Sequence, residues 1–285
     1  MNKISVVLMV YNRKEYYREA LDSLANQNGL DFELLIYSNI DIEYNLQKFR
    51  QVDTIYPEKP EMAYWLSDAL KRAKYDKIAF LDDDDRYASY KISHLKNEDI
   101  EGYYHNDYYD FGSKEAHSNG KGFNASCIAI NKSAYNGIME LTQQHPLLGY
   151  MPDSMIYWYA LEHNIPVVID NGKLTYYRHK PYQKMYANLA DTLHKQMAAL
   201  EEASKTFKSP EVHEIIREVS IQNQIYLNSL GHYKKISIND LIWLMGRNVT
   251  GKKGKIASYF LSLPLWHGVG VKWMDRIRVQ REVEK

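Results

Sequence analysis

Four consecutive aspartates, Asp82 to Asp85, follow directly on the segment 77–81, which has the length and the apolar character of a buried strand. Adjacent carboxylates repel one another, and a protein core cannot bury them without partners. Because alternate residues of an extended chain face the same way, Asp82 and Asp84 are expected to share one site while Asp83 faces the other side. Carboxylate ligands favour Mg²⁺, Mn²⁺ or Ca²⁺ over Zn²⁺ or copper. An acidic turn in solvent is the alternative, but ligands of open α/β sheets gather outside the carboxyl ends of strands, which favours a cation site.

Segments with strand and helix character alternate on the N-terminal side of this acidic run. Residues 4–10 form a near-continuous apolar run, which is typical of a strand covered on both faces. The expected strands are 4–10, 32–37, 53–56 and 77–81, and the expected helices are 14–26, 43–50 and 61–73. This alternation predicts an α/β fold with a Rossmann-like, mostly parallel sheet flanked by helices.

The pattern changes after Asp85. The expected elements are a tyrosine-rich strand at 101–111, a loop at 112–122, a strand at 125–130, and helices at 133–142 and from Pro152 to about 163. The dipeptide Asn171-Gly172 between two strand-like runs predicts a hairpin of residues 166–170 and 173–177. From about residue 181 the pattern is helical, so a helical C-terminal extension is expected.

Composition limits the function classes. The formal net charge is zero, so nothing draws the chain as a whole to nucleic acid. The single cysteine, Cys127, cannot form an internal disulfide, which fits a reducing compartment. There is no run of 18 apolar residues, and the N-terminus is too short for a signal peptide. We therefore expect a cytoplasmic protein.

The last segment, residues 247–285, is basic and carries Trp266 and Trp273. Basic charge beside aromatic and aliphatic residues suits a helix that lies on an anionic membrane, which would place the protein peripherally at the inner face. An ordinary packed C-terminal helix has a similar composition, so both interpretations stay open.

Several short motifs occur in a characteristic order. The strand 4–10 runs into Tyr11-Asn12-Arg13, Phe80-Leu81 runs into the aspartates, Pro152-Asp153 begins a helix, and Tyr177-Arg178-His179 follows the last strand. This series resembles the family 2 glycosyltransferases with the nucleotide-sugar-binding GT-A fold, over roughly residues 3 to 180. The resemblance implies a transferase domain at 1–180 and a helical, basic region at 181–285.

The resemblance also implies ligands and roles. The donor would be a nucleotide-diphosphate sugar, the cofactor Mn²⁺ or Mg²⁺, and the acceptor a glycan or a lipid-linked glycan of surface polysaccharide synthesis. Asp82, Asp84 and His179 correspond to the metal side of the site, and Asp153 to the catalytic base. The positions that correspond to the nucleotide side are Val10, Tyr11, Arg13, Asn39, Asp41 and Asp83.

Three positions depart from the family's usual pattern. Asn39 stands where an aspartate normally contacts the base or ribose, and Asp41 is expected to substitute for it. The segment 65–67 lacks an arginine that usually lies near the phosphates, and Pro152 replaces a glutamate before Asp153. These departures leave the identity of the donor open. They also keep open the alternative of a catalytically degenerate nucleotide- or glycan-binding module.

The chemistry expected of these residues is an inverting transfer. A cation held by Asp82 and Asp84 would neutralise the leaving diphosphate, and Asp153 would take the proton of the acceptor hydroxyl. Asp153 as a simple helix cap and His179 as an ordinary histidine remain alternatives. Sugar-nucleotide pyrophosphorylases are disfavoured because no glycine-rich loop follows the first strand. Haloacid-dehalogenase-type phosphatases are disfavoured because their aspartates follow that first strand.

Overall fold

The computed structural model describes residues 3–58, 62–117, 124–178 and 189–229, together with isolated residues between 231 and 243. By its internal contacts the chain divides into two compact units, Met1–His179 and Lys180–Lys285. His179 and the basic segment 247–285 lie outside the described residues, so the expectations for them stay predictions. Among the described helices, none combines the length and the apolarity needed to cross a membrane.

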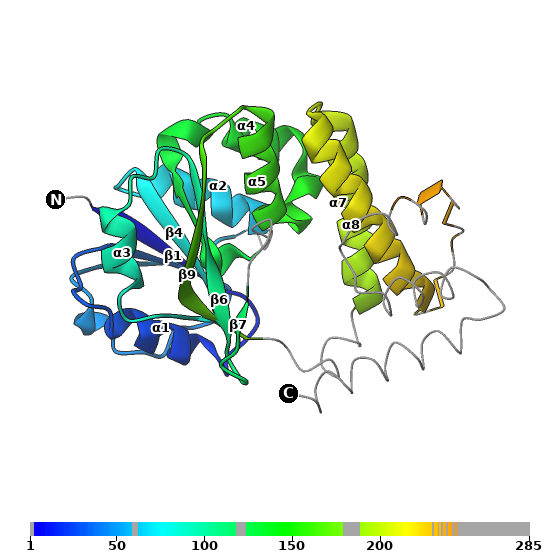
Figure 1. Cartoon of the computed structure of the whole chain (residues 1–285). Helices are drawn as coiled ribbons and strands as arrows, with labels where there is room; N and C mark the ends of the chain where they lie inside the picture. The colour runs from blue at the N-terminus through cyan, green and yellow to red at the C-terminus, as the bar shows by residue number, and fades with distance from the viewer. Residues whose placement is uncertain are drawn as a thin grey trace. The chain divides into compact units, whose positions relative to one another are not determined.

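The first unit is built on one sheet of nine strands (Figure 1). The strands are β1 (Ile4–Val10), β2 (Glu33–Ser38), β3 (Gln51–Ile55), β4 (Lys77–Asp82), β5 (Arg86–Tyr87), β6 (Tyr103–Asp110), β7 (Ala116–His117), β8 (Ile128–Asn131) and β9 (Val167–Tyr177). Their order is β3-β2-β1-β4-β8-β6-β9-β5, and β7 pairs with β6. The run from β3 to β4 is parallel, which confirms the predicted α/β fold.

Helices cover both faces of this sheet. They are α1 (Tyr17–Ala25), α2 (Met62–Arg72), α3 (Lys91–Asn97), α4 (Ile138–Gln144) and α5 (Pro152–Glu162). Figure 1 shows α1 and α3 on one face and α2, α4 and α5 on the other. Leu8 of β1 packs in one cluster with Leu21 and Leu95, whereas Trp65 and Trp158 are buried on α2 and α5. Burial on both faces explains why 4–10 is apolar at nearly every position.

Two predicted boundaries in the second half of this unit are wrong. The expected strand 125–130 begins as a turn of 3₁₀ helix at Ala125–Cys127 and becomes strand β8 only from Ile128. Asn124 starts the turn, because its side-chain oxygen accepts the N–H of Ser126 at 2.9 Å. The expected helix 133–142 divides into a 3₁₀ turn, Lys132–Tyr135, and helix α4.

The predicted hairpin at Asn171-Gly172 is also wrong. Strand β9 continues through both residues and stays parallel to β6, with shifts of register on either side of Asp107. Neither Asn171 nor Gly172 has the positive φ that a two-residue hairpin turn requires. Instead the Asp170 carboxylate accepts the N–H of Gly172 at 2.7 Å. The extra residues Asn171, Gly172 and Leu174 are therefore accommodated as irregularities within one continuous strand.

The second unit contains the helices α7 (Leu189–Thr206) and α8 (Pro210–Ser229), which pack on each other. Leu193 and Leu200 of α7 are buried. Helix α8 begins at Pro210, and proline suits the first turn of a helix. These helices confirm the predicted helical extension for the part of it that the structure describes.

Candidate active site

The candidate site lies where three parallel strands end. The register pairs Val10 of β1 with Ser38 of β2, and Met9 of β1 with Asp82 of β4. The carboxyl ends of β1, β2 and β4 therefore lie side by side at one edge of the sheet. The residues that follow them, including Arg13, Asn39 and the acidic run, meet at this edge, where α/β proteins bind ligands.

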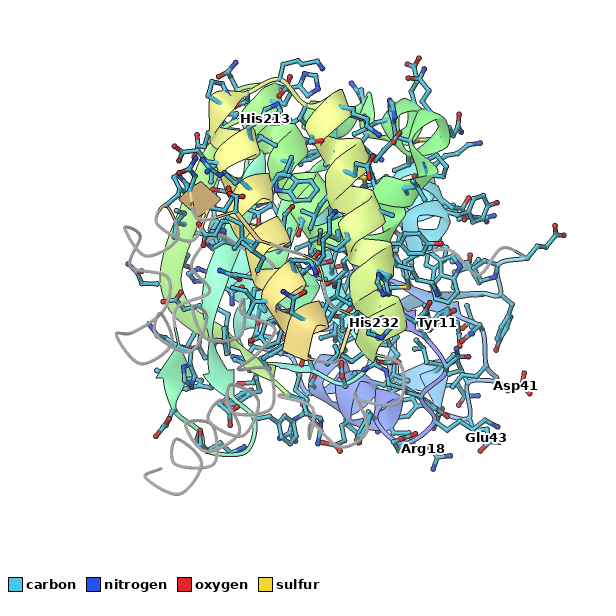
Figure 2. The ribbon with its side chains drawn as sticks, turned by 90° about the vertical axis from the view of Figure 1, so that its right-hand side faces the viewer. Tyr11, Arg18, Asp41, Glu43, His213 and His232 are labelled. Atoms are coloured by element: carbon cyan, nitrogen blue, oxygen red, sulfur yellow. The ribbon has the colours of Figure 1, made fainter. Side chains whose placement is uncertain are left out.

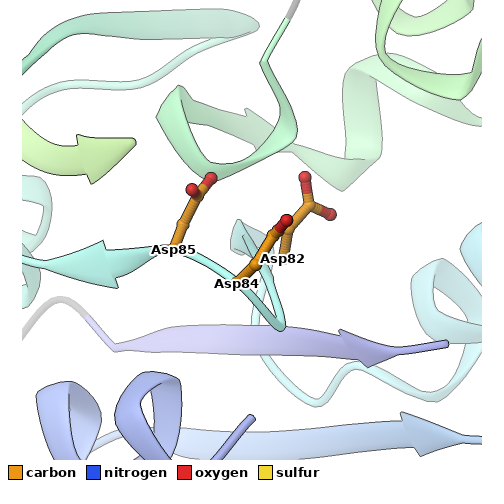
Figure 3. A group of neighbouring side chains, drawn as sticks. All are labelled: Asp82, Asp84 and Asp85. Atoms are coloured by element: carbon orange, nitrogen blue, oxygen red, sulfur yellow. The ribbon is translucent and has the colours of Figure 1, made fainter. Parts of the chain in front are cut away.

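The acidic run is a tight turn and not an extension of the strand. Strand β4 ends at Asp82, and the N–H of Asp85 donates to the carbonyl oxygen of Asp82 at 3.3 Å. Each of Asp82, Asp84 and Asp85 offers a carboxylate oxygen, and these three oxygens lie within 4.8 Å of one another (Figure 3). The alternation of an extended chain stops at Asp82, so it could not predict that Asp85 joins the cluster. The unbroken run of four aspartates is the one sequence feature that could have indicated it.

The environment of Asp85 fits a bound cation. Its side chain is only 1% exposed, and its Oδ1 accepts the backbone N–H of Arg178 at 2.8 Å. Its Oδ2 is buried and has no hydrogen-bond partner among the described residues. Burial and the negative charges of Asp82 and Asp84 raise the pKa of Asp85 well above its usual range. Three carboxylates around one point are the ligand set of a hard divalent ion such as Mg²⁺ or Mn²⁺.

Asp83 points away from this cluster and toward the loop that follows β1. It is fully buried, and its Oδ2 accepts the backbone N–H of Tyr11 at 3.0 Å. Its Oδ1 lies 2.6 Å from Nη2 of Arg13, whose Nη1 donates to Asp84. Burial raises the pKa of Asp83 to about 7, although the charge of Arg13 opposes the shift. Arg13 therefore joins two neighbouring carboxylates of the acidic run.

An amide pair fixes the loop after β1. Asn12 has a φ of 57°, a left-handed conformation that asparagine tolerates better than most residues. Its N–H donates to Oδ1 of Asn39 at 2.9 Å, and Nδ2 of Asn39 donates to Oδ1 of Asn12 at 2.7 Å. Asn39, predicted to contact the nucleotide, thus uses both side-chain polar atoms to hold this turn. Its contact with a nucleotide stays a prediction.

The other predicted nucleotide-side residues lie along the same edge. The side chain of Val10 is fully buried, so only its backbone can face a ligand. The ring of Tyr11 packs on Trp65 with 5.6 Å between centroids. Asp41 lies in the loop after β2, and its exposed carboxylate points to solvent (Figure 2). Leu66, at the position of the usual arginine, is buried and cannot contact phosphate.

Asp153, the predicted base, lies in the first turn of α5 and is connected to the acidic cluster by the turn Ala125–Cys127. The N–H of Ala125 donates to Oδ2 of Asp153 at 3.1 Å. The next residue, Ser126, accepts the backbone N–H of Asp82 at its Oγ, at 3.0 Å. Burial and the negative charge of Asp82 raise the pKa of Asp153 to about 8. The two predicted functional groups therefore contact consecutive residues of one short segment.

The sequence did not indicate Lys91, which contacts the turn Ala125–Cys127 through Ser126. Lys91 is fully buried, and its Nζ donates to the carbonyl oxygen of Ser126 at 2.6 Å and to Oγ1 of Thr175 at 2.9 Å. The ammonium also lies 4.1 Å from the centre of the Tyr87 ring. Burial lowers the pKa of Lys91 to about 7. No sequence motif indicates a role for this lysine, because it lies in an ordinary amphipathic helix.

The motif Tyr177-Arg178-His179 does not indicate the role of Arg178, which follows β9 and contacts the acidic turn. Its Nε donates to the carbonyl oxygen of Asp84 at 3.0 Å, and its Nη2 lies 2.9 Å from Oε2 of Glu19. Its guanidinium stacks 3.8 Å from the centre of the Phe111 ring. Together with the bond from its N–H to Asp85, these contacts anchor the acidic turn to the last strand of the sheet.

Comparison with known proteins places this domain in a family. Residues 5–110 match the family model described as glycosyl transferase family 2. The O-antigen biosynthesis glycosyltransferase WbnJ of Escherichia coli is 32% identical over 93 residues, which cover 30% of this chain and 37% of that protein. The aligned region thus spans little more than a third of the curated relative. The chain carries a glycosyl transferase family 2 domain, as the resemblance of its motifs implied.

Solved structures extend the likeness in fold to most of the chain. S. aureus TarS residues 1–349 in complex with UDP-GlcNAc superposes with a TM-score of 0.53 at 14% identity, covering 94% of this chain and 84% of that one. The complex of the same protein with UDP gives a TM-score of 0.50 at 13% identity, over 94% and 83% of the two chains. At these identities the likeness defines the fold, which is of the GT-A type.

Proposed function

We propose that this chain is a metal-dependent, inverting glycosyltransferase that moves a sugar from a nucleotide-diphosphate donor to a hydroxyl acceptor. The family 2 domain and the relative named for O-antigen biosynthesis support a role in polysaccharide or glycan synthesis. The observation that carries the proposal is the turn Ala125–Cys127. It binds the backbone of Asp82 through Ser126 and the carboxylate of Asp153 through Ala125. A cation site and a base held by one rigid segment can face the two sides of one reacting carbon.

Each functional carboxylate has a separate task in this mechanism. Asp82, Asp84 and Asp85 would hold Mn²⁺ or Mg²⁺, which when bound stabilises the charge that develops on the leaving diphosphate. Asp153 would accept the proton of the acceptor hydroxyl. The acceptor oxygen forms a bond to the anomeric carbon as the bond from that carbon to the phosphate oxygen breaks, and attack from the opposite side inverts the configuration. A pKa of about 8 suits a base that works near neutral pH.

UDP-sugars are the first donors to test, because TarS was solved with UDP and with UDP-GlcNAc. We assign binding and transfer to residues 1–180 and assign an accessory role to 181–285. His179 as a further metal-side group and residues 247–285 as a peripheral membrane contact belong to the same proposal. A cytoplasmic location and a glycan or lipid-linked acceptor complete it.

Donor hydrolysis tests this function without knowledge of the acceptor. The full chain would be incubated with a panel of UDP-sugars, with Mn²⁺ or with EDTA, and released UDP would be measured. We expect release from one donor, with Mn²⁺ only, and loss of release in the double variant Asp82→Asn/Asp84→Asn. Release that persists in EDTA or in the double variant would contradict the metal-dependent mechanism.

A catalytically degenerate binding module is the second candidate. The amide pair of Asn12 and Asn39 and the buried Leu66 favour it, because both replace groups that usually contact the donor. This candidate predicts saturable nucleotide binding with no release of UDP from any sugar donor. The transferase proposal predicts both binding and release.

A further inference from the structure

Arg13 occupies part of the candidate cation site. Its Nη1 donates to Oδ2 of Asp84, and its Nη2 lies 2.6 Å from Oδ1 of Asp83. Asp84 is also one of the three carboxylates whose oxygens converge, together with Asp82 and Asp85. One carboxylate therefore serves two positively charged partners, the guanidinium and the cation that the cluster is suited to bind.

The competition for Asp84 cannot be relieved by loss of a proton. An arginine side chain stays protonated in proteins, and the carboxylates of Asp83, Asp84 and Asp82 raise the pKa of Arg13 further against the effect of burial. A cation that binds the cluster thus meets a fixed positive charge on one of its ligands. Either the cation binds weakly or Arg13 moves.

The surroundings of Arg13 allow it to move. Its side chain is 26% exposed, whereas those of Asp83 and Asp84 are 0% and 7% exposed, so the arginine is the member of the group that reaches solvent. Asp83 keeps the N–H of Tyr11 as a partner when Arg13 leaves. The planar, forked donors of a guanidinium also match a phosphate group as well as they match a carboxylate.

We propose that Arg13 is a built-in counter-ion that competes with the divalent cation for Asp84 and, once displaced, pairs with the diphosphate of the donor. The inference rests on the proposed function and deepens it. An arginine usually lies near the phosphates at the position of Leu66, which is uncharged and buried here. Arg13 would supply the missing positive charge. The exchange would also keep the carboxylates neutralised before the cation and the donor arrive.

Removal of Arg13 should therefore change two affinities in opposite directions. In Arg13→Gln the competitor is gone, so the affinity for Mn²⁺ alone should rise by about 10-fold, which corresponds to about 1.4 kcal/mol. The affinity for UDP at saturating Mn²⁺ should fall by about 10-fold, because a charge-assisted hydrogen bond to phosphate is lost. Arg13→Lys keeps the positive charge but lacks the forked donors of the guanidinium. Its Mn²⁺ affinity should lie between those of the wild type and Arg13→Gln.

Electron paramagnetic resonance of free Mn²⁺ measures the first affinity directly on the full chain, and calorimetry with UDP measures the second. Arg72→Gln is the matched control, because Arg72 is an exposed arginine that pairs with Asp68 at 2.6 Å on α2, remote from the acidic run in sequence. It should leave both affinities unchanged. Circular dichroism establishes whether each variant is folded. If Arg13→Gln does not fold, the two affinities are compared between the wild type and Arg13→Lys.

The outcomes separate this inference from the proposed function. Equal or weaker Mn²⁺ binding in Arg13→Gln, with normal binding in the wild type, would overturn the counter-ion role and leave the metal-dependent function standing. Absence of Mn²⁺ binding in both proteins would overturn the proposed metal site and the inference with it. Tighter Mn²⁺ binding together with weaker UDP binding would support the exchange.

Discussion

The carboxylate of Asp153 accepts the backbone N–H of Ala125 at 3.1 Å, so the proposed base is held by the same turn that supports Asp82. Two residues 71 positions apart therefore contact one short segment. The turn Ala125–Cys127 thus connects two strands and also holds Asp153 and Asp82 by hydrogen bonds.

Replacement of Asp153 by asparagine should slow transfer but preserve the fold. The amide oxygen can still accept the N–H of Ala125, whereas the side chain can no longer take a proton. Loss of a general base costs roughly 10²-fold or more in rate. Donor turnover should fall by this amount while UDP affinity stays within a few-fold of the wild type. Asp191→Asn is the matched control, because Asp191 is an exposed aspartate in the first turn of α7. Turnover near the wild-type rate in Asp153→Asn would show that another group is the base.

The rate of transfer should rise with pH. Only the deprotonated form of Asp153 can act as a base, and its pKa is raised to about 8, so activity should increase as the pH rises through that value. The charge of Asp82 contributes to this shift, so saturation with Mn²⁺ should move the rise to lower pH. A pH series of kcat at low and saturating Mn²⁺ measures both effects. A profile that falls with pH between 6 and about 8 would contradict the assignment.

Removal of the Ser126 hydroxyl should weaken the cation site. Ser126→Ala leaves the buried N–H of Asp82 without its acceptor, which costs about 1–3 kcal/mol of folding free energy. The displaced Asp82 should also bind Mn²⁺ more weakly. Urea unfolding and Mn²⁺ titration measure the two effects, with Ser133→Ala as an exposed control. Unchanged Mn²⁺ affinity would mean that the turn does not position the carboxylate.

Substitution of Lys91 should remove a pH dependence of stability. Burial lowers the pKa of Lys91 in the folded state to about 7, whereas an unfolded lysine keeps a pKa near 10.4. Between these values the unfolded state binds more protons, so this group makes the folded state more stable as the pH rises, by at most about 1.4 kcal/mol per pH unit. Lys91→Met should abolish this contribution.

Urea unfolding of wild type and Lys91→Met at pH 7.5, 8.5 and 9.5 measures the difference. The comparison cancels the groups that titrate in this range without interacting with Lys91. As the pH rises, the free energy of unfolding of the wild type should increase relative to that of the variant. Parallel pH profiles would mean that Lys91 is charged in the folded protein.

Much of the fold was readable from the sequence, because hydrophobic periodicity records which faces are buried. The run 4–10 is apolar at nearly every position because both faces of β1 are covered, and α8 begins at Pro210 because proline suits a first helical turn. Asn171-Gly172 was misleading because its hairpin signal is local, whereas the pairing of β9 with β6 is a long-range contact. Tertiary pairing outweighs a local turn preference in such cases.

The candidate site was readable only in part. The four aspartates indicate where the site lies. That Asp85 joins Asp82 and Asp84 depends on the geometry of a turn, which the sequence does not specify. The role of Lys91 depends on burial against Ser126, a residue 35 positions away. The pairing of Asn12 with Asn39 likewise requires the register of β1 against β2. Contacts of this kind arise from strand order, which a single sequence does not specify.

The central claim is that the acidic turn binds a divalent cation on which nucleotide binding depends. Thermal unfolding of the full chain with a panel of nucleoside diphosphates, with and without Mn²⁺, tests it most directly. We expect one nucleotide, UDP first, to stabilise the protein only when Mn²⁺ is present, by about 2.7 kcal/mol at 100 times its dissociation constant. The double variant Asp82→Asn/Asp84→Asn should lose this stabilisation. Equal stabilisation without Mn²⁺, or in the double variant, would contradict the account.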